Sequence, residues 1–258
     1  LITWDSVYFG HYPQSDATGE IKEPIKWRVL WVEGNDAFLL ADRNLDMQQY
    51  NACRQAVLWE ECTMRSWLNG YGKDCNVCGI DYTNDNFLNR AFTAKEQEAI
   101  IVTNVINRSA PKSKVLSGSD TQDKIFLLSF EEVTNADYGF DKDCMKYGEG
   151  RKPKHTAYVD AGGSIHSDVG RSANGRFSWW LRTPGKDLEH GADVASYGVA
   201  SDYGLWVDRC DNAVRPALHL NLEYADCWSY AGTICSKELE ALTPSTIERL
   251  LFDDIPYL

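Results

Sequence analysis

Two apolar segments near the carboxyl end of the chain enclose a stretch of quite different character. Residues 179–182 and 217–222 both have the composition of strands. Between them, Gly191, Gly198 and Gly204 separate short polar or aromatic clusters. Glycine permits tight turns between short strands, because it adopts backbone conformations that other residues avoid. The pattern predicts a meander of short strands held between two scaffold strands.

The side chains of the enclosed stretch are of two kinds. Small apolar residues such as Ala192 and Val207 can pack inward, which leaves the others to form one displayed face. That face is rich in Tyr, Ser, Asp, Asn, Trp and Arg, a mixture of rigid aromatic anchors and adaptable polar groups that is typical of binding surfaces. The expected ligand-binding residues are Asp187, Leu188, Glu189, His190, Ser196, Tyr197, Ser201, Asp202, Tyr203, Leu205, Trp206, Asp208, Arg209, Asp211 and Asn212. A solvated meander with partly buried aromatic residues is the alternative interpretation, since aromatic side chains commonly belong to cores.

The residues at the two ends of this stretch are expected to belong to the scaffold. They are Trp179, Trp180, Arg182, Arg215 and Pro216. Both arginines sit beside turns, where a guanidinium can donate to loop carbonyls or to a carboxylate across the strand ends. Clamping an anionic ligand is the alternative role for this arginine pair.

The remainder of the chain predicts more strands and two helices. Strand composition marks four segments, which are 4–12, 25–32, 37–41 and 124–129. The second and third of these form a hairpin around a turn. Helical spacing of apolar residues predicts a helix over 59–70. A second helix is expected over 87–101, with a capping box of Thr93 and Glu96. Residues 134–175 are rich in glycine and polar residues, which indicates irregular surface structure.

Six sequence blocks follow one another along the chain, namely Phe9–Ser15, Ile25–Leu30, Trp59–Asn69, Asp123–Ser129, Trp179–Gly185 and Val214–Leu218. In this order they resemble an uncharacterised family of bacterial and phage proteins from gut communities (DUF6273-like), which is similar to the variable proteins of diversity-generating retroelements. The resemblance runs from about Trp4 to Leu222. It implies an α+β, C-type-lectin-like fold with short twisted antiparallel strands, two helices and much irregular loop structure. The expected domain covers residues 1–222, and a C-terminal extension with a short helix follows over 223–258.

The resemblance also implies a receptor-type binding protein and not an enzyme, with a protein or glycan surface as its partner. In the retroelement proteins, variation comes from mutated adenines, mostly in Asn codons, and such codons cannot yield Glu or Trp. Glu189 and Trp206 depart from this pattern, so active diversification of the displayed face is an open question. A structural adhesin module, in which no small patch dominates, is a further alternative.

An oxidoreductase related to the formylglycine-generating enzymes, which share the lectin-like fold, is the alternative function. It requires two thiols within reach of each other in a cleft. Cys227 and Cys235 do not match that family's cysteine pair, since they lie past the last expected core strand. Cys75 and Cys78 make half of a zinc site without a second half, so a local disulfide or two free thiols are expected there. No metal and no cofactor is predicted, because the calcium motifs of sugar-binding lectins are also missing.

The charge and hydropathy of the chain restrict its partners. The formal net charge of −12 repels phosphate backbones, so nucleic acid is not expected as a partner. The longest apolar runs are about five residues long, far short of the roughly 20 that span a bilayer, so no membrane span is predicted. We favour an extracellular, cell-surface or phage-particle location over a cytoplasmic one. The sequence leaves the oligomeric state open.

Overall fold

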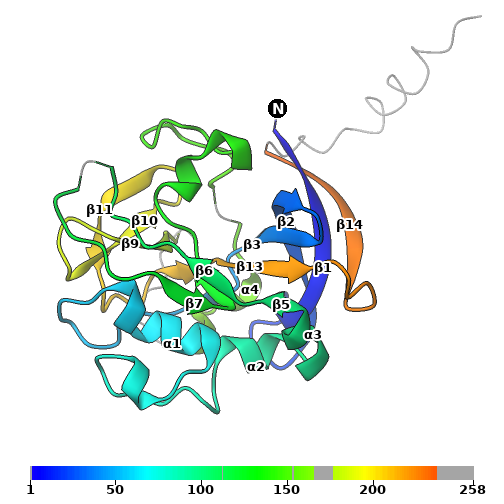
Figure 1. Cartoon of the computed structure of the whole chain (residues 1–258), viewed down its shortest axis with the longest axis horizontal. Helices are drawn as coiled ribbons and strands as arrows, with labels where there is room; N and C mark the ends of the chain where they lie inside the picture. The colour runs from blue at the N-terminus through cyan, green and yellow to red at the C-terminus, as the bar shows by residue number, and fades with distance from the viewer. Residues whose placement is uncertain (1, 112, 153, 166–176, 237–258) are drawn as a thin grey trace, which may run out of the picture.

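The computed structural model describes residues 2–111, 113–152, 154–165 and 177–236. It is an α+β protein in which strands predominate (Figure 1). The larger sheet has seven strands, six of which lie in the order β14 (Trp228–Cys235), β1 (Thr3–Pro13), β2 (Lys22–Glu33), β3 (Asp36–Ala41), β13 (Pro216–Asn221) and β5 (Ile100–Ile101). The seventh strand, β8 (Ile125–Leu127), also pairs with β13.

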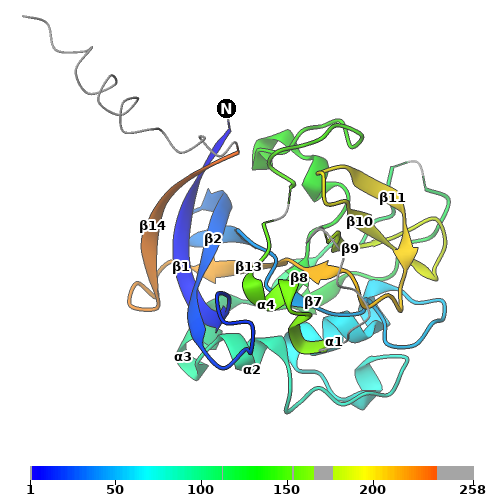
Figure 2. The same cartoon turned by 180° about the vertical axis from the view of Figure 1, so that it is seen from behind.

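The smaller sheet has five strands in the order β11 (Ala200–Trp206), β10 (His190–Val194), β9 (Trp179–Pro184), β12 (Ala213–Val214) and β4 (Asp46–Met47). A separate pair consists of β6 (Thr103–Val105) and β7 (Thr121–Asp123). Figures 1 and 2 place β1, β2 and β14 on one side of the molecule and β10 and β11 on the opposite side. The chain passes from the smaller sheet to the larger one at Arg215, which lies between β12 and β13.

Four α-helices occur in the described part of the chain, and they are α1 (Thr63–Asn69), α2 (Phe87–Ala91), α3 (Ala94–Ala99) and α4 (Ala157–Asp160). The helix predicted over 59–70 starts only at Thr63, because Cys62 is extended and serves as its N-cap. The helix predicted over 87–101 is divided into α2 and α3. Thr93 is extended and forms the predicted capping box with Glu96, so the backbone leaves the helical conformation between them. The prediction of two helices was therefore wrong in number.

The predicted strands are present. Residues 4–12 lie in β1, and the predicted hairpin is β2–β3, in which Val32 faces Ala37 across the turn. The segment 217–222 lies mostly in β13, but β13 is not the last strand. Instead, β14 follows it and pairs with β1 from Phe9 back to Thr3. The first part of the expected C-terminal extension, up to Cys235, thus belongs to the large sheet. The short helix expected later in this extension, from Thr243, lies outside the described residues.

The largest aromatic side chains belong mainly to the core. Trp27, Trp59, Trp179 and Trp180 are each at most 2% exposed, whereas Trp206 is 36% exposed. Composition alone left the role of the aromatic residues open, and the structure assigns most of this burial to one core cluster, to which both sheets and the helices contribute. No helix in the described ranges is long and apolar enough to cross a membrane.

The region predicted to be irregular, 134–175, has no strand in its described part. Its regular structure consists of short helical turns and α4. The 3-10 turns in the described part of the chain are η1 (Trp59–Glu61), η2 (Lys73–Cys75), η3 (Glu132–Thr134), η4 (Ala136–Tyr138) and η5 (Gly163–Ile165). Arg151 is fully buried at the centre of this region. Its guanidinium donates hydrogen bonds to the carbonyls of Val133, Asp141, Asp143, Lys146 and Gly198. Because Gly198 lies in the turn between β10 and β11, Arg151 ties the irregular region to that hairpin.

Replacing Arg151 tests this role. Arg151→Lys should lower the free energy of unfolding by about 3 kcal/mol or more, since one ammonium reaches only part of the carbonyl set and leaves the rest buried without a donor. Urea unfolding measures the loss. The matched control is Lys152→Ala, because Lys152 pairs with Glu149 where both side chains are about 40% exposed, and its loss should cost less than about 0.5 kcal/mol. Equal unfolding free energies for the two variants would contradict the assigned role.

Candidate functional site

The stretch predicted to be displayed, 187–212, forms the β10–β11 hairpin and the turns beside it. Its predicted ligand residues differ in exposure. The exposed ones are Asp187, Glu189, Tyr197, Tyr203, Trp206 and Arg209. The half-buried ones are Leu188, Ser196, Ser201, Asp202, Leu205, Asp208 and Asp211. His190 and Asn212 are only 3% and 2% exposed, so the expectation that they are displayed was wrong.

Two of the three glycines of this stretch lie inside strands instead of between them. Gly198 has a φ of 90° and occupies the turn between β10 and β11, as predicted. Gly204 has a φ of 75° within β11, and a Cβ there would come within 2.3 Å of the carbonyl oxygen of Gly191 in β10. The pairing register shifts between Gly191 and Asp193, which identifies this close approach as a bulge.

Trp206 is at the centre of a cluster of aromatic and cationic side chains at the open end of the hairpin. The register pairs His190 with Trp206, which places both side chains on one face of the sheet. Their ring centroids are 3.9 Å apart. The Arg54 guanidinium carbon lies 3.5 Å from the centroid of the Trp206 ring. Both neighbours are therefore in van der Waals contact with the indole, and the guanidinium is placed for a cation–π interaction.

Tyr203 carries the second half of this cluster. The ammonium of Lys186 lies 4.3 Å from the centroid of the Tyr203 ring and 3.0 Å from its hydroxyl oxygen. The same ammonium lies 5.6 Å from the centroid of the Trp206 ring. We call Arg54, Lys186, His190, Tyr203 and Trp206 the Trp206 cluster. Its exposed rings are each paired with a cation, which holds them in defined positions.

Sequence reasoning missed Arg54 and Lys186. Lys186 directly precedes the predicted stretch and could have been included in it. Arg54 belongs to a loop far away in the sequence. Two backbone hydrogen bonds hold this loop against the hairpin region: Asn51 N donates to the Val207 carbonyl, and Val57 N donates to the Leu188 carbonyl, each at 2.9 Å. Local periodicity contains no signal for contacts of this kind.

His190 connects the buried side of the cluster to its rim. Its Nδ1 lies 2.6 Å from Oδ1 of Asp187. Burial acts to raise the pKa of the Asp187 carboxyl, but the hydrogen bonds from His190 and from the backbone N–H of Glu189, together with nearby positive charge, lower the net pKa. Asp187 therefore fixes the orientation of the imidazole that contacts Trp206.

Tyr197 lies apart from the Trp206 cluster. It occupies the turn at the closed end of the hairpin, whereas Trp206 is at the open end. There it makes an edge contact with Tyr147, with ring centroids 5.3 Å apart, and the two are 52% and 72% exposed. The exposed aromatic residues of the predicted site thus lie in two separate groups, with Tyr197 at the closed end of β10–β11 and Tyr203 with Trp206 in the cluster.

The predicted scaffold residues are all buried. Trp179 and Trp180 are fully inaccessible, and Pro216 faces Leu127 in the large sheet. Arg182 makes a bidentate ion pair with Glu132, at 2.6 and 2.9 Å. Arg215 donates to the carbonyls of Ala41 and Asp42. Both guanidinium groups therefore tie strand ends together from within the protein.

Asp193 is a buried carboxyl in β10, on the sheet that carries the site. It is 5% exposed, and burial raises its pKa from 3.8 to about 6, against a hydrogen bond from Ser178 and the charge of Arg209. A raised pKa means that the folded protein binds this proton more tightly than the unfolded chain. Its contribution to stability is therefore fully present below about pH 4 and is lost as the pH rises through about 6.

Asp193→Asn isolates this effect. The variant should gain stability relative to the native protein as the pH rises from 4 to 7.5, by up to about 3 kcal/mol for a shift of about two pKa units. Urea unfolding of both proteins at four pH values measures the difference. Ser201→Ala, at the position that faces Asp193 on the neighbouring strand, removes no titratable group and is the control, so its difference should not vary with pH. A pH-independent difference for Asp193→Asn as well would refute the raised pKa.

The cysteines near the site make a pair that the sequence did not predict. The backbone N–H of Cys53 donates to Sγ of Cys78 at 3.1 Å, and the two thiols hydrogen-bond to each other. Burial, followed by the Cys53 thiol, raises the pKa of Cys78 to about 11. Cys75 is exposed and Cys78 is partly buried. Within the described ranges, no group of three or more His, Cys, Asp or Glu side chains is placed to hold a metal ion.

Cys78 should therefore alkylate slowly. Thiolate is the reactive species, and a pKa of about 11 leaves little thiolate on Cys78 at neutral pH. After reduction and removal of the reductant, iodoacetamide at pH 7.5 should label exposed Cys75 well before Cys78, as measured by peptide mass spectrometry over time. Faster labelling of Cys78 than of Cys75 would contradict the environment assigned to it.

Fold and site together define a strand-rich α+β protein that carries an exposed cluster of aromatic rings paired with cations. Residues 34–222 match the family described as "Domain of unknown function (DUF6273)", and the chain belongs to that family. The matched range contains the whole Trp206 cluster and the hairpin that carries it. No curated protein and no solved structure matches the chain.

Proposed function

We propose that this chain is a receptor-type binding protein and not an enzyme, which displays the β10–β11 hairpin on a C-type-lectin-like scaffold. Its partner is a protein or glycan surface. The observation that carries the proposal is the Trp206 cluster, in which Arg54 and Lys186 cover aromatic rings that remain open to solvent.

The chemistry of the cluster favours recognition. Trp, Tyr and Arg are the residues that most often dominate the energy of binding at interfaces. Rings that are already held by cations and by His190 lose little conformational freedom when a partner binds, which reduces the entropic cost of association. The remaining N–H groups of Arg54 and Lys186 can donate to carbonyl, hydroxyl or carboxylate oxygens of the partner.

The mixed α+β architecture, with two mostly antiparallel sheets and long irregular segments, supports the lectin-like scaffold. We also propose that the protein is a target of a diversity-generating retroelement. Exposed Tyr side chains and exposed or half-buried Ser and Asp side chains gather on the hairpin and its turns, as that function requires, while Trp206 acts as a constant anchor. Sequencing of the surrounding genome tests this part: it fails if no near-copy of the codons for 179–220 lies beside a reverse transcriptase.

The binding role is tested with surface variants. Labelled native protein, Trp206→Ala and Tyr203→Ala are applied to a glycan array and to intact gut bacteria. Each variant should lose binding by roughly 10- to 100-fold, which is typical for residues that dominate an interface. The midpoint of thermal unfolding should change by less than about 3 °C, because both side chains are partly exposed.

Tyr230→Ala is the matched control, since Tyr230 is 62% exposed on β14 at the other side of the molecule. Its binding should equal that of the native protein. Tyr197→Ala reports separately on the closed end of the hairpin. The proposal is overturned if Trp206→Ala and Tyr230→Ala bind alike, or if the native protein binds neither the array nor the cells.

An oxidoreductase is the second candidate, and one observation favours it. Cys53 and Cys78 are in contact, which meets the requirement for two neighbouring thiols. The raised pKa of Cys78 opposes a reactive thiolate at neutral pH, so we prefer the binding role. Thiol titration together with metal analysis of the purified protein separates the two candidates, because only the oxidoreductase requires a redox-active pair or a bound metal.

A further inference from the structure

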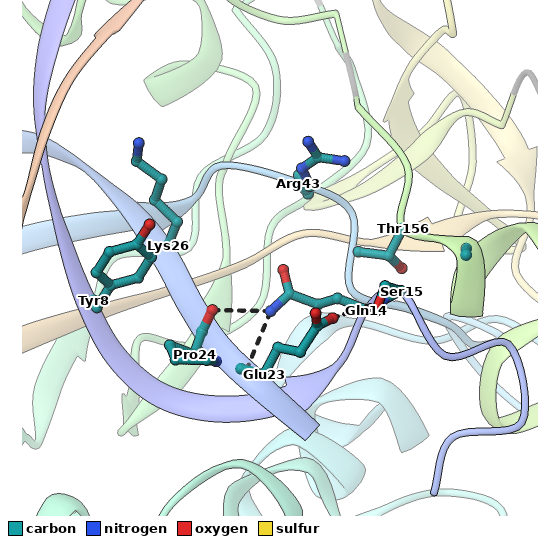
Figure 3. A pocket seen from close by; sticks show the side chains of 9 residues that line it. Tyr8, Gln14, Ser15, Glu23, Pro24, Lys26, Arg43 and Thr156 are labelled. Carbon is teal, nitrogen blue, oxygen red and sulfur yellow. Dashed lines mark hydrogen bonds between the residues drawn. The ribbon is translucent and has the colours of Figure 1, made fainter. Parts of the chain in front are cut away.

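A concave surface lies next to β1 and β2, on the other side of the molecule from the hairpin that carries the Trp206 cluster. It is a cavity of about 630 Å³ between strands β1 and β2 of the large sheet and the start of α4. Its walls include Tyr8 of β1, Pro24 and Lys26 of β2, Gln14 after β1 and Arg43 after β3 (Figure 3). This volume is in the range of cavities that hold small molecules.

Two cations with unused hydrogen-bonding capacity line the cavity. Among the described residues, the Lys26 ammonium has no hydrogen-bond or ion-pair partner. Arg43 donates one long hydrogen bond, from Nη1 to the His155 carbonyl at 3.3 Å, and has no carboxylate partner within the described ranges. Figure 3 shows Lys26 beside Tyr8 and Arg43 above Gln14, so the two head groups flank the space between them. The nearest acid in the lining, Glu23, already accepts from the backbone N–H of Ser15 at 2.7 Å.

The protein beneath Arg43 adds further positive charge. Arg28 and Arg215 are both buried, and both contact Asp42. Arg28 Nε lies 2.7 Å from Oδ1 of the Asp42 carboxylate, and Arg215 donates to the Asp42 backbone carbonyl. Burial, together with the charge of Arg28, lowers the pKa of Arg215. The end of β3 is therefore locally cationic in a chain whose formal net charge is −12. Such a local field attracts anions to a concave surface.

The other lining groups suit a hydroxylated ligand. The amide nitrogen of Gln14 donates to the carbonyls of Glu23 and Pro24, at 3.2 and 2.9 Å. The amide oxygen is thereby turned toward the cavity, where it can accept a hydrogen bond from a ligand (Figure 3). Tyr8 is 41% exposed, and with Pro24 it offers an apolar wall on which the C–H face of a sugar ring can pack.

We propose that this cavity binds an acidic monosaccharide, either free or at the end of a glycan. Lys26 and Arg43 bind its carboxylate or phosphate, Gln14 accepts from a ring hydroxyl, and the ring packs against Tyr8 and Pro24. Two cations that flank the space, together with an acceptor and an apolar wall in the same lining, match an anionic group attached to a hydroxylated ring. This site is independent of the Trp206 cluster.

Isothermal titration of the whole chain with four probes tests the proposal: glucuronic acid, glucose 6-phosphate, glucose and inorganic phosphate. At least one of the two acidic sugars should bind with a Kd of roughly 0.1–1 mM, a value usual for small polar ligands with few contacts. Glucose and inorganic phosphate should each bind at least about tenfold more weakly. The comparison of carboxylate with phosphate identifies which anionic group the cations prefer.

Charge variants then locate the binding. Lys26→Gln and Arg43→Gln should each weaken binding by more than about tenfold, since each removes a charge-assisted hydrogen bond. Raising the salt concentration should also weaken it. Lys142→Gln makes the same change of charge at an exposed position outside the lining and should leave the Kd unchanged. Trp206→Ala should leave it unchanged as well, which separates this site from the proposed receptor face.

Four results would overturn the proposal. They are equal binding of glucose and the acidic sugars, binding of inorganic phosphate as tight as that of either sugar, unchanged affinity in both cavity variants, and no detectable heat with any probe at 10 mM. Thermal unfolding of each variant confirms that loss of binding is not loss of the fold, because Lys26 and Arg43 are lining residues with few internal contacts.

Discussion

The buried guanidinium of Arg151 holds together a part of the molecule that has little secondary structure. Regular strands and helices satisfy their own backbone groups, but a long irregular segment cannot, and its buried carbonyls need other donors. Arg151 supplies these donors to the irregular region and to the turn of the β10–β11 hairpin at once. Arg182 and Arg215 do the same at the ends of β8 and β3. The hairpin that carries the proposed site is therefore bonded to irregular segments whose backbone carbonyls are held by buried arginines.

A rigid hairpin allows its surface side chains to be ordered by one another. At the open end, each exposed ring of the Trp206 cluster is covered by a cation, and Asp187 fixes the imidazole beneath them. Cation–π contacts and charge-assisted hydrogen bonds act over short distances, so they need the loop that carries Arg54 to be held firmly. The backbone hydrogen bonds of Asn51 and Val57 provide that support. The cavity near Lys26 is built differently, because neither Lys26 nor Arg43 pairs with an aromatic ring or a carboxylate among the described residues.

Prediction from the sequence succeeded where the determinants are local. The β2–β3 hairpin follows from a turn between two apolar runs, and the capping box of Thr93 and Glu96 follows from residue type and spacing. The same capping box explains an error: by starting α3 it ended α2, so one expected helix became two. The strand β14 was missed because its sequence is only partly buried, and pairing with β1 makes it a strand.

The sequence by itself determined that a glycine-rich, polar and aromatic segment lies between two buried strands, since burial of 179–182 and 217–222 requires only their apolar side chains. It could not determine which residues of that segment are displayed. Tertiary structure buried His190 and Asn212, separated Tyr197 from Trp206 by the length of the hairpin, and brought Arg54 onto the indole. The physical reason is that exposure and cation–π contact depend on which distant loop packs against the strand, and sequence spacing does not contain that information.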